Sequence, residues 1–272
     1  MFQQFIITRF NLRLSEWKHT KRGDDILSES WLKKRFQLFE TYCLPSVAQQ
    51  TNTNFTWLVF FDTATPEVYK TKISEYTKNY PNFTPVFLKA GADILQAISK
   101  EINIKLTDND THIITTRLDN DDALHQDFIA HIQQQFIKTD RLVIDVSEGY
   151  QLHLQHKKTP AIRGISFAFN PFVSIIESRD NFKTILSKSH LSWQSHPHHT
   201  IANTPLWLQV IHNDNISNAE SLQFKETNVF TASHFGIQHK MMLKSNTNIL
   251  WSNFCSFIKR ILIKLKIVNL SL

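Results

Sequence analysis

Three carboxylates fall within four residues of this chain, at Asp119, Asp121 and Asp122. They follow an apolar, β-branched stretch over residues 111–118, which predicts a strand. Negative charges this close repel one another, so the cluster is unfavourable unless a positive group neutralises it. Oxygen ligands of this kind suit Mg²⁺ or Mn²⁺, which complete their shell with water and substrate phosphates. The pattern therefore indicates a site for a divalent cation that carries a diphosphate.

A solvated turn is the alternative interpretation, because Asp and Asn favour turns without any ligand. A second acidic segment, at residues 108–110, is interpreted as such a turn. The cluster does not match an EF-hand loop, since it lacks the glycine required by the sharp turn. Its position after a predicted strand favours the binding site, because open α/β sheets bind ligands beyond the carboxyl ends of their strands.

Segments of two periodicities alternate around the cluster. Apolar runs predict strands over 4–10, 55–61, 83–88 and 111–118, and spacings of three and four predict helices over 31–48, 66–78, 92–104 and 126–138. Pro45 is expected to kink or end the first of these helices. The alternation predicts an α/β fold with a mixed, mostly parallel sheet flanked by helices.

The alternation of strand and helix patterns ends after residue 140. Strand-like pieces follow at 141–146, 150–156 and 163–169, then a His-rich loop at 190–199 and an apolar run at 206–211. We interpret 1–240 as one domain with halves at 1–124 and 125–240, followed by a tail at 241–272. No run of 18 uncharged apolar residues occurs, so no transmembrane helix is expected. The interrupted apolar stretch at residues 2–10 does not fit a signal peptide.

The tail predicts a basic amphipathic helix. It spaces apolar side chains helically, with Lys and Arg between them: Leu250, Phe254, Phe257, Ile261, Leu265 and Val268. Such a helix typically lies on an anionic membrane surface, although packing on the domain is the alternative. The formal net charge is +6, and much of it lies here. Nucleic acid is not an expected partner, because no RNA-binding signature, zinc-finger spacing or leucine zipper is found.

The two cysteines, Cys43 and Cys255, lie far apart, which argues against a disulfide framework and suits a reducing compartment. We therefore expect a cytoplasmic protein, peripheral on the inner membrane where its tail binds. The hydrophobic fraction of 42% in 272 residues is enough for a sizeable core.

Several segments share their order with a known family: Trp31-Leu32, Arg35-Phe36, Trp57 to Asp62, Thr116 to Leu124 and Pro205 to His212. Over roughly residues 4–240 the chain resembles the bacterial family named putative rhamnosyltransferase, which has the GT-A glycosyltransferase fold. The resemblance implies a GT-A-like (Rossmann-related) domain, with a nucleotide-sugar-binding half at 1–124 and an acceptor-side half at 125–240. It also implies Mn²⁺ or Mg²⁺ as cofactor.

The activity that this resemblance implies is sugar transfer. The donor would be dTDP-L-rhamnose, the acceptor a cell-surface glycan or lipid-linked glycan, and the stereochemistry inverting. No residue specifies rhamnose, so a UDP-hexose donor stays open. Two other classes stay open as well: a metal-dependent phosphohydrolase and a non-catalytic sugar- or membrane-binding module. The phosphohydrolase is disfavoured because the cluster follows the fourth predicted strand and not the first.

Within this family pattern the metal candidates are Asp119, Asp121 and His212, with Asp121 the direct ligand. Asp122 would orient a sugar hydroxyl or contact the metal through water. A neutral imidazole is a competent ligand, but a histidine satisfied at a strand end is the alternative for His212.

The remaining donor-side candidates lie near strand ends. Arg9 and Arg117 could pair with phosphate through a planar guanidinium, although Arg117 could equally be a structural partner of Asp119. Thr8, Arg9 and Asp62 match places where GT-A enzymes hold the nucleoside. Asp62 would accept a hydrogen bond from the base imide, or it would simply cap its strand.

Inversion requires a general base, whereas a retaining enzyme requires none. Asp214 is the first candidate, because it follows His212 in the region where many inverting GT-A enzymes place their base, and Glu177 is the second. The wider set also contains Asp145, Glu148 and Asp180. The His-rich segment is expected to form a loop over the acceptor and not a metal site, since no cysteine or carboxylate stands at ligand spacing: His190, His196, His198 and His199.

Overall fold

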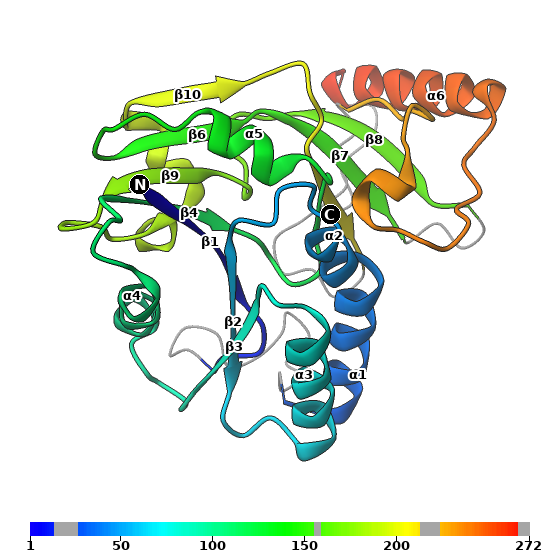
Figure 1. Cartoon of the computed structure of the whole chain (residues 1–272). Coiled ribbons are helices and arrows are strands. Elements are labelled where there is room, and N and C mark those ends of the chain that lie inside the picture. The colour runs from blue at the N-terminus through cyan, green and yellow to red at the C-terminus, as the bar shows by residue number, and fades with distance from the viewer. Residues whose placement is uncertain (14–26, 155–158, 213–223, 266–272) are drawn as a thin grey trace.

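A seven-stranded sheet forms the centre of the computed structural model, which describes residues 1–13, 27–154, 159–212 and 224–265 (Figure 1). Its order is β10-β6-β9-β4-β1-β2-β3. The strands are β1 (Phe2–Arg9), β2 (Thr56–Asp62), β3 (Phe83–Leu88), β4 (His112–Arg117), β6 (Leu142–Val146), β9 (Ser174–Ser178) and β10 (His198–Ile201). Only β9 runs antiparallel to its neighbours, so the predicted mixed, mostly parallel sheet is confirmed.

Helices cover both faces of this sheet. The helices are α1 (Glu29–Leu38), α2 (Leu44–Ala48), α3 (Glu67–Asn79), α4 (Ile94–Lys105), α5 (Phe128–Gln134) and α6 (Asn246–Lys264). Figure 1 shows α1, α2 and α3 on one face of β1–β3 and α4 on the other. The strand alternation explains this, because Ile6 packs with the α1–α3 side while Phe5 and Ile7 pack with Ile98 of α4. Buried on both faces, β2 has the near-continuous apolar sequence of a central parallel strand.

A second sheet has the order β5-β11-β7-β8. Its strands are β5 (Ala123–Leu124), β7 (Glu148–His153), β8 (Ala161–Ser166) and β11 (Trp207–Ile211). Leu124, Phe128 and Trp207 belong to the same buried cluster as Ile6, so one core extends across both halves of the chain. No helix in the described parts of the chain is long and apolar enough to cross a membrane.

Three strands were not predicted. β9 and β5 had no assignment, and the segment expected to be a His-rich loop contains a 3₁₀ helix at His190–Ser195 followed by β10. β10 is exposed along most of its length, and it pairs only with β6. Its polar sequence carries no alternation, because an edge strand with both faces near solvent need not alternate.

The predicted helix at 31–48 also differs in one respect. The helical segment does not end at Pro45, because a π-helical turn at Phe39–Cys43 joins α1 to α2, which runs to Ala48. The N–H of Leu44 bonds to the carbonyl of Phe39, five residues back. Pro45 then falls in the first turn of α2, where its missing N–H costs little. π turns of this kind occur often at functional sites.

Candidate active site

The acidic cluster lies just past the carboxyl end of β4, in the turn that leads into β5. Asn120 fixes this turn to the end of β1, since its Nδ2 donates to the carbonyl of Phe10 at 2.8 Å and of Arg9 at 3.2 Å. The N–H of Leu118 bonds to the carbonyl of Ile7. The carboxylates are therefore held where two parallel strands end, the predicted place for a ligand.

Asp121 lies at the centre of the site between two basic side chains. Nη1 of Arg35 lies 2.7 Å from its Oδ2, and Nε2 of His212 lies 2.8 Å from the same oxygen. Burial alone would raise the pKa of Asp121, but the charge of Arg35 and the hydrogen bond from His212 lower it to about 2. Asp121 is therefore ionised at neutral pH, and His212 lies beside the cluster.

The pKa of Asp122 is shifted in the opposite direction to that of Asp121. Oδ1 of Asp122 accepts the N–H of Val210 at 2.8 Å, which joins the cluster to β11. Burial and the neighbouring charges of Asp121 and Asp119 raise the pKa of Asp122 well above its ordinary value, and this one hydrogen bond does not offset them. Two adjacent carboxyl groups thus differ in protonation tendency, because Asp121 directly contacts two basic side chains whereas Asp122 contacts a backbone N–H and is influenced by Arg117 only through its charge.

Asp119 is the most solvent-accessible member, with 37% of its side chain exposed. Arg117 holds it through Nη2 at 2.8 Å from Oδ2, with a further bond from Nε to Oδ1. The charge of Asp119 raises the pKa of Arg117, while burial lowers that of nearby Arg9. Arg117 is thus a structural partner of Asp119, the second of the two predicted roles, and it remains close enough to meet a ligand there.

Two residues that the sequence analysis assigned no role complete the site. Arg35 reaches the cluster from α1, contacts Oδ1 of Asn120 at 3.1 Å, and lies 5.0 Å from the ring of Trp31. Its sequence signal is weak, since a lone Arg beside buried apolar residues also describes an ordinary amphipathic helix. Cys43, in the π turn, lies beneath the site with its Sγ 3.6 Å from the carbonyl of Asp119.

A divalent cation would find suitable donor atoms here. Mg²⁺ and Mn²⁺ accept one or two carboxylates and complete their shell with phosphates and water. Asp119 and Asp121 have this chemistry, and Arg35 and His212 both engage Oδ2 of Asp121 and not Oδ1. In the described residues no three His, Cys, Asp or Glu side chains are grouped as a metal site. Asp119 and Asp121 are thus the carboxylates that such a cation would meet among the described residues of the cluster.

The structure corrects two nucleoside candidates. Thr8 is buried and its Oγ1 accepts a hydrogen bond from Nε1 of Trp57 at 2.9 Å, so its side chain supports the core. Both oxygens of Asp62 accept hydrogen bonds from Arg13, at 2.9 and 3.1 Å. Burial opposes this charge, yet Arg13 and the N–H of Ala64 keep the pKa of Asp62 below its ordinary value. A base contact would have to displace Arg13.

The structure also shows where the candidates for the general base lie. Glu177 pairs with Ile113 near the amino end of β4, away from the cluster, and its carboxylate accepts the N–H groups of Lys183 and Thr184 at 2.9 Å each. The structure therefore corrects Glu177 to a buried structural acceptor. Asp145 has a similar role, since its Oδ1 accepts the N–H of Phe169. Asp214 lies outside the described residues.

Neither Glu148 nor Asp180 is brought to the cluster. Glu148 begins β7, beside the first residues of the parallel strand β11, whereas His212 follows the last residue of β11. Asp180 follows β9. Of the His-rich segment, His190 comes closest: it contacts the carbonyl of Phe169, and its pKa, lowered mainly by burial, also responds to Arg117 and Asp119. His190 therefore lies near the pair formed by Arg117 and Asp119.

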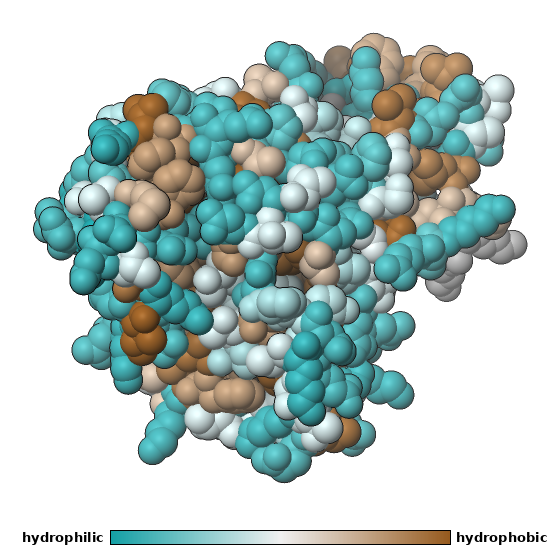
Figure 2. Space-filling view, viewed as in Figure 1, coloured by the Kyte–Doolittle hydropathy of each residue, from teal (hydrophilic) through white to brown (hydrophobic). Residues whose placement is uncertain are grey.

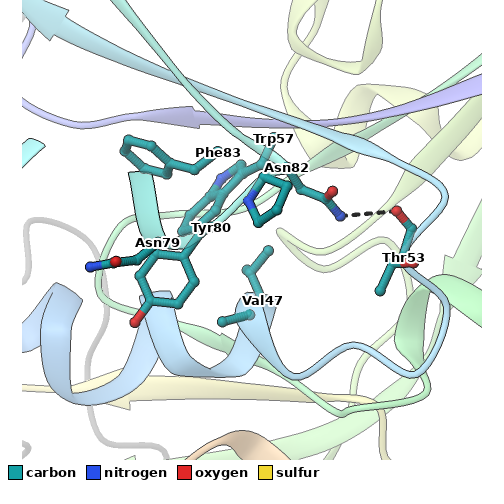
Figure 3. Close-up of a pocket in the computed structure, with 9 residues that line it drawn as sticks. Val47, Thr53, Trp57, Asn79, Tyr80, Asn82 and Phe83 are labelled. Carbon is teal, nitrogen blue, oxygen red and sulfur yellow. Dashed lines mark hydrogen bonds between the residues drawn. The ribbon is translucent and has the colours of Figure 1, made fainter. Parts of the chain in front are cut away.

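A pocket of about 450 Å³ lies at the opposite end of the strands (Figure 3). Trp57, Tyr80 and Phe83 surround it, and Nδ2 of Asn82 donates to the carbonyl of Thr53 at its margin. Trp57 begins β2, whereas the acidic cluster follows the end of β4, so this pocket is separate from the site.

Comparison with known proteins gives the class. A family model described as "Putative rhamnosyl transferase" matches residues 6–223, and no curated protein matches the chain. The match covers most of the chain, including the mixed α/β sheet and the strand-end carboxylates. The chain belongs to the putative rhamnosyl transferase family.

Solved structures similar to the chain include S. aureus TarS 1-349, with 12% identity and a TM-score of 0.42 over 76% of this chain and 60% of that one. The same protein in complex with UDP-GlcNAc gives 13% and 0.42 over 81% and 62%. A nucleoside-diphosphate-sugar pyrophosphorylase from Vibrio cholerae RC9 gives 11% and 0.35 over 76% and 91%. The chain thus spans about 60% of the TarS fragment. These similarities are too low to assign a substrate.

Proposed function

We propose that this glycosyltransferase moves L-rhamnose from dTDP-L-rhamnose to a cell-surface glycan or lipid-linked glycan, with inversion, at the acidic cluster. The family match supports the reaction, and the arrangement of Arg35, Asp121 and His212 is the observation that carries the site. A UDP-hexose donor is the second candidate. The reducing compartment suggested by the sequence supports a cytoplasmic location, on the inner face of the membrane.

Charge neutralisation is the central task of these residues. As the bond to the sugar breaks, negative charge accumulates on the departing nucleoside diphosphate. Mn²⁺ or Mg²⁺ held by Asp119 and Asp121, with His212 beside them, would supply positive charge at that point. Arg9 and Arg117 lie near Asp119 and bring guanidinium groups suited to phosphate oxygens.

The acceptor must lose a proton during inversion. We propose Asp214 as its general base, because the residue follows His212, whose ring contacts Asp121. Asp122 is proposed to orient a sugar hydroxyl or to contact the metal through water. A transition state of this type resembles an oxocarbenium ion, as at other glycosyl centres.

The first test is thermal stabilisation of the full chain by dTDP, UDP, GDP and CMP, each with Mn²⁺ or with a chelator. A ligand that binds only the native state raises Tm by mass action. We expect dTDP with Mn²⁺ to give the largest shift, and Asp121→Asn to remove it. A larger shift with UDP than with dTDP would favour a UDP-hexose donor. Equal shifts with Mn²⁺ and with chelator would contradict a cation at the site. Hydrolysis of simple phosphate esters with no nucleotide response would favour a phosphohydrolase.

A further inference from the structure

Helix α6 is attached to the second sheet through one face. Ile249 is its buried residue, and Asn253 pairs with both backbone groups of Glu226, at 2.7 Å to the N–H and 3.0 Å to the carbonyl. Ser252 donates to Oε1 of Glu226 at 2.9 Å. Glu226 is itself buried and held by Lys244 at 2.8 Å. These contacts fix which side of α6 faces the body of the protein.

The opposite face of α6 is apolar and exposed. Trp251 is 68% exposed and Phe254 53%, and their rings lie 5.9 Å apart. The other exposed apolar side chains of this face are Leu250, Phe257, Ile258, Ile261 and Leu265. At about 100° per residue, these positions fall within an arc of roughly 120°, directed away from Ile249 and Ser252. Figure 2 shows brown residues along α6 at the upper right of the molecule. We call this set the α6 stripe.

The basic residues of α6 favour one kind of occupant for the α6 stripe. The helix sequence holds Lys259, Arg260 and Lys264 and no acidic residue, so the helix that bears the stripe carries a net positive charge. A basic helix with a continuous aromatic and aliphatic face, lying flat, matches the interface of an anionic bilayer. A protein groove would not by itself require this charge. We propose that the α6 stripe docks the enzyme on a membrane surface rich in anionic lipid.

The direct test is co-sedimentation of the full chain with vesicles of phosphatidylcholine alone or mixed with phosphatidylglycerol. We expect binding to the mixed vesicles only, weakened at high salt. Lys259→Glu with Lys264→Glu should weaken it on the order of tenfold or more, because each basic residue near the surface adds to the attraction. Trp251→Ser with Phe254→Ser should abolish it. All four residues are exposed, so Tm is expected to change little.

The matched control is Lys78→Glu with Lys100→Glu, which makes the same charge change on exposed positions of α3 and α4. This variant should bind nearly as the unchanged protein does. Equal weakening by both pairs of charge reversals would overturn a docking role for α6. Concentration-dependent dimers that disappear in the Trp251 and Phe254 variant, with no vesicle binding, would mean that a second copy covers the stripe and would also overturn the proposal.

Discussion

Arg35 and Asp121 are 86 residues apart in sequence, and their side chains meet at 2.7 Å. Both side chains are only 11% exposed, so the pair is a buried link between α1 and the end of β4. The contact places a permanent positive charge beside the carboxylate where the departing diphosphate is expected.

Arg35→Met is expected to destabilise the protein by about 3 kcal/mol, because removing one partner of a buried ion pair leaves the charge of Asp121 with only the hydrogen bond from His212. Urea unfolding measures this. The control is Lys33→Met on the exposed side of α1, which should change the free energy of unfolding little. Equal effects of the two substitutions would show that the buried pair contributes nothing.

Asp121→Asn is expected to lower kcat/KM by about a hundredfold or more, as loss of an electrostatic group at a reacting centre does. It also changes acid stability. The lowered pKa means that the carboxylate stabilises the fold above its ordinary pKa of about 4, and that this contribution is lost as the pH falls through about 2. Tm measured from pH 5 to about pH 2 should therefore fall less steeply in the variant than in the unchanged protein. Full activity would contradict the site.

Asp122→Asn is expected to stabilise the protein at neutral pH, unlike Asp121→Asn. The raised pKa means that ionisation of Asp122 opposes folding, so a neutral amide that still accepts the N–H of Val210 should raise Tm at pH 7. The gain should vanish below about pH 4, where the carboxyl is protonated in both states. A Tm below that of the unchanged protein at pH 7 would contradict the assigned protonation.

Glu177→Gln tests the corrected role of that residue. One of its two backbone partners, Lys183 or Thr184, would face an NH₂ group, so we expect a loss of about 1–3 kcal/mol in unfolding free energy. Turnover at a temperature where the variant is folded should stay near that of the unchanged enzyme, whereas Asp214→Asn should abolish it. Loss of turnover in folded Glu177→Gln would return the base assignment to Glu177.

Gly149→Ala tests the packing of the second sheet. An added Cβ would lie 2.1 Å from Cδ2 of Trp207, whose Nε1 donates to the carbonyl of Val146 and whose ring stacks on Phe172. Displacing this ring should cost about 1–3 kcal/mol. Gly164→Ala on neighbouring β8 is the matched control, because nothing lies within 4 Å of its Cβ. Thermal unfolding compares the two.

Much of the fold follows from local pattern. β1, β2 and β4 and the helices between them were predicted because each has a strong periodicity and a polar boundary. β9 was missed although it lies inside the sheet between β6 and β4, since its five residues carry no alternation that distinguishes them from a buried loop. β10 was missed because an exposed edge strand places few constraints on its sequence.

By itself, the sequence determined that an acidic cluster ends a buried strand, that the fold is α/β, and that a basic amphipathic segment follows, because these depend on residue type and short spacing. Only the tertiary structure decided which groups meet the cluster. Arg35 and His212 contact Asp121, from which they are 86 and 91 residues apart in sequence. Antiparallel pairing of β9 with β4 places Glu177 beside the other end of β4. Contacts at such separations depend on how strands order themselves in a sheet, which no local pattern encodes.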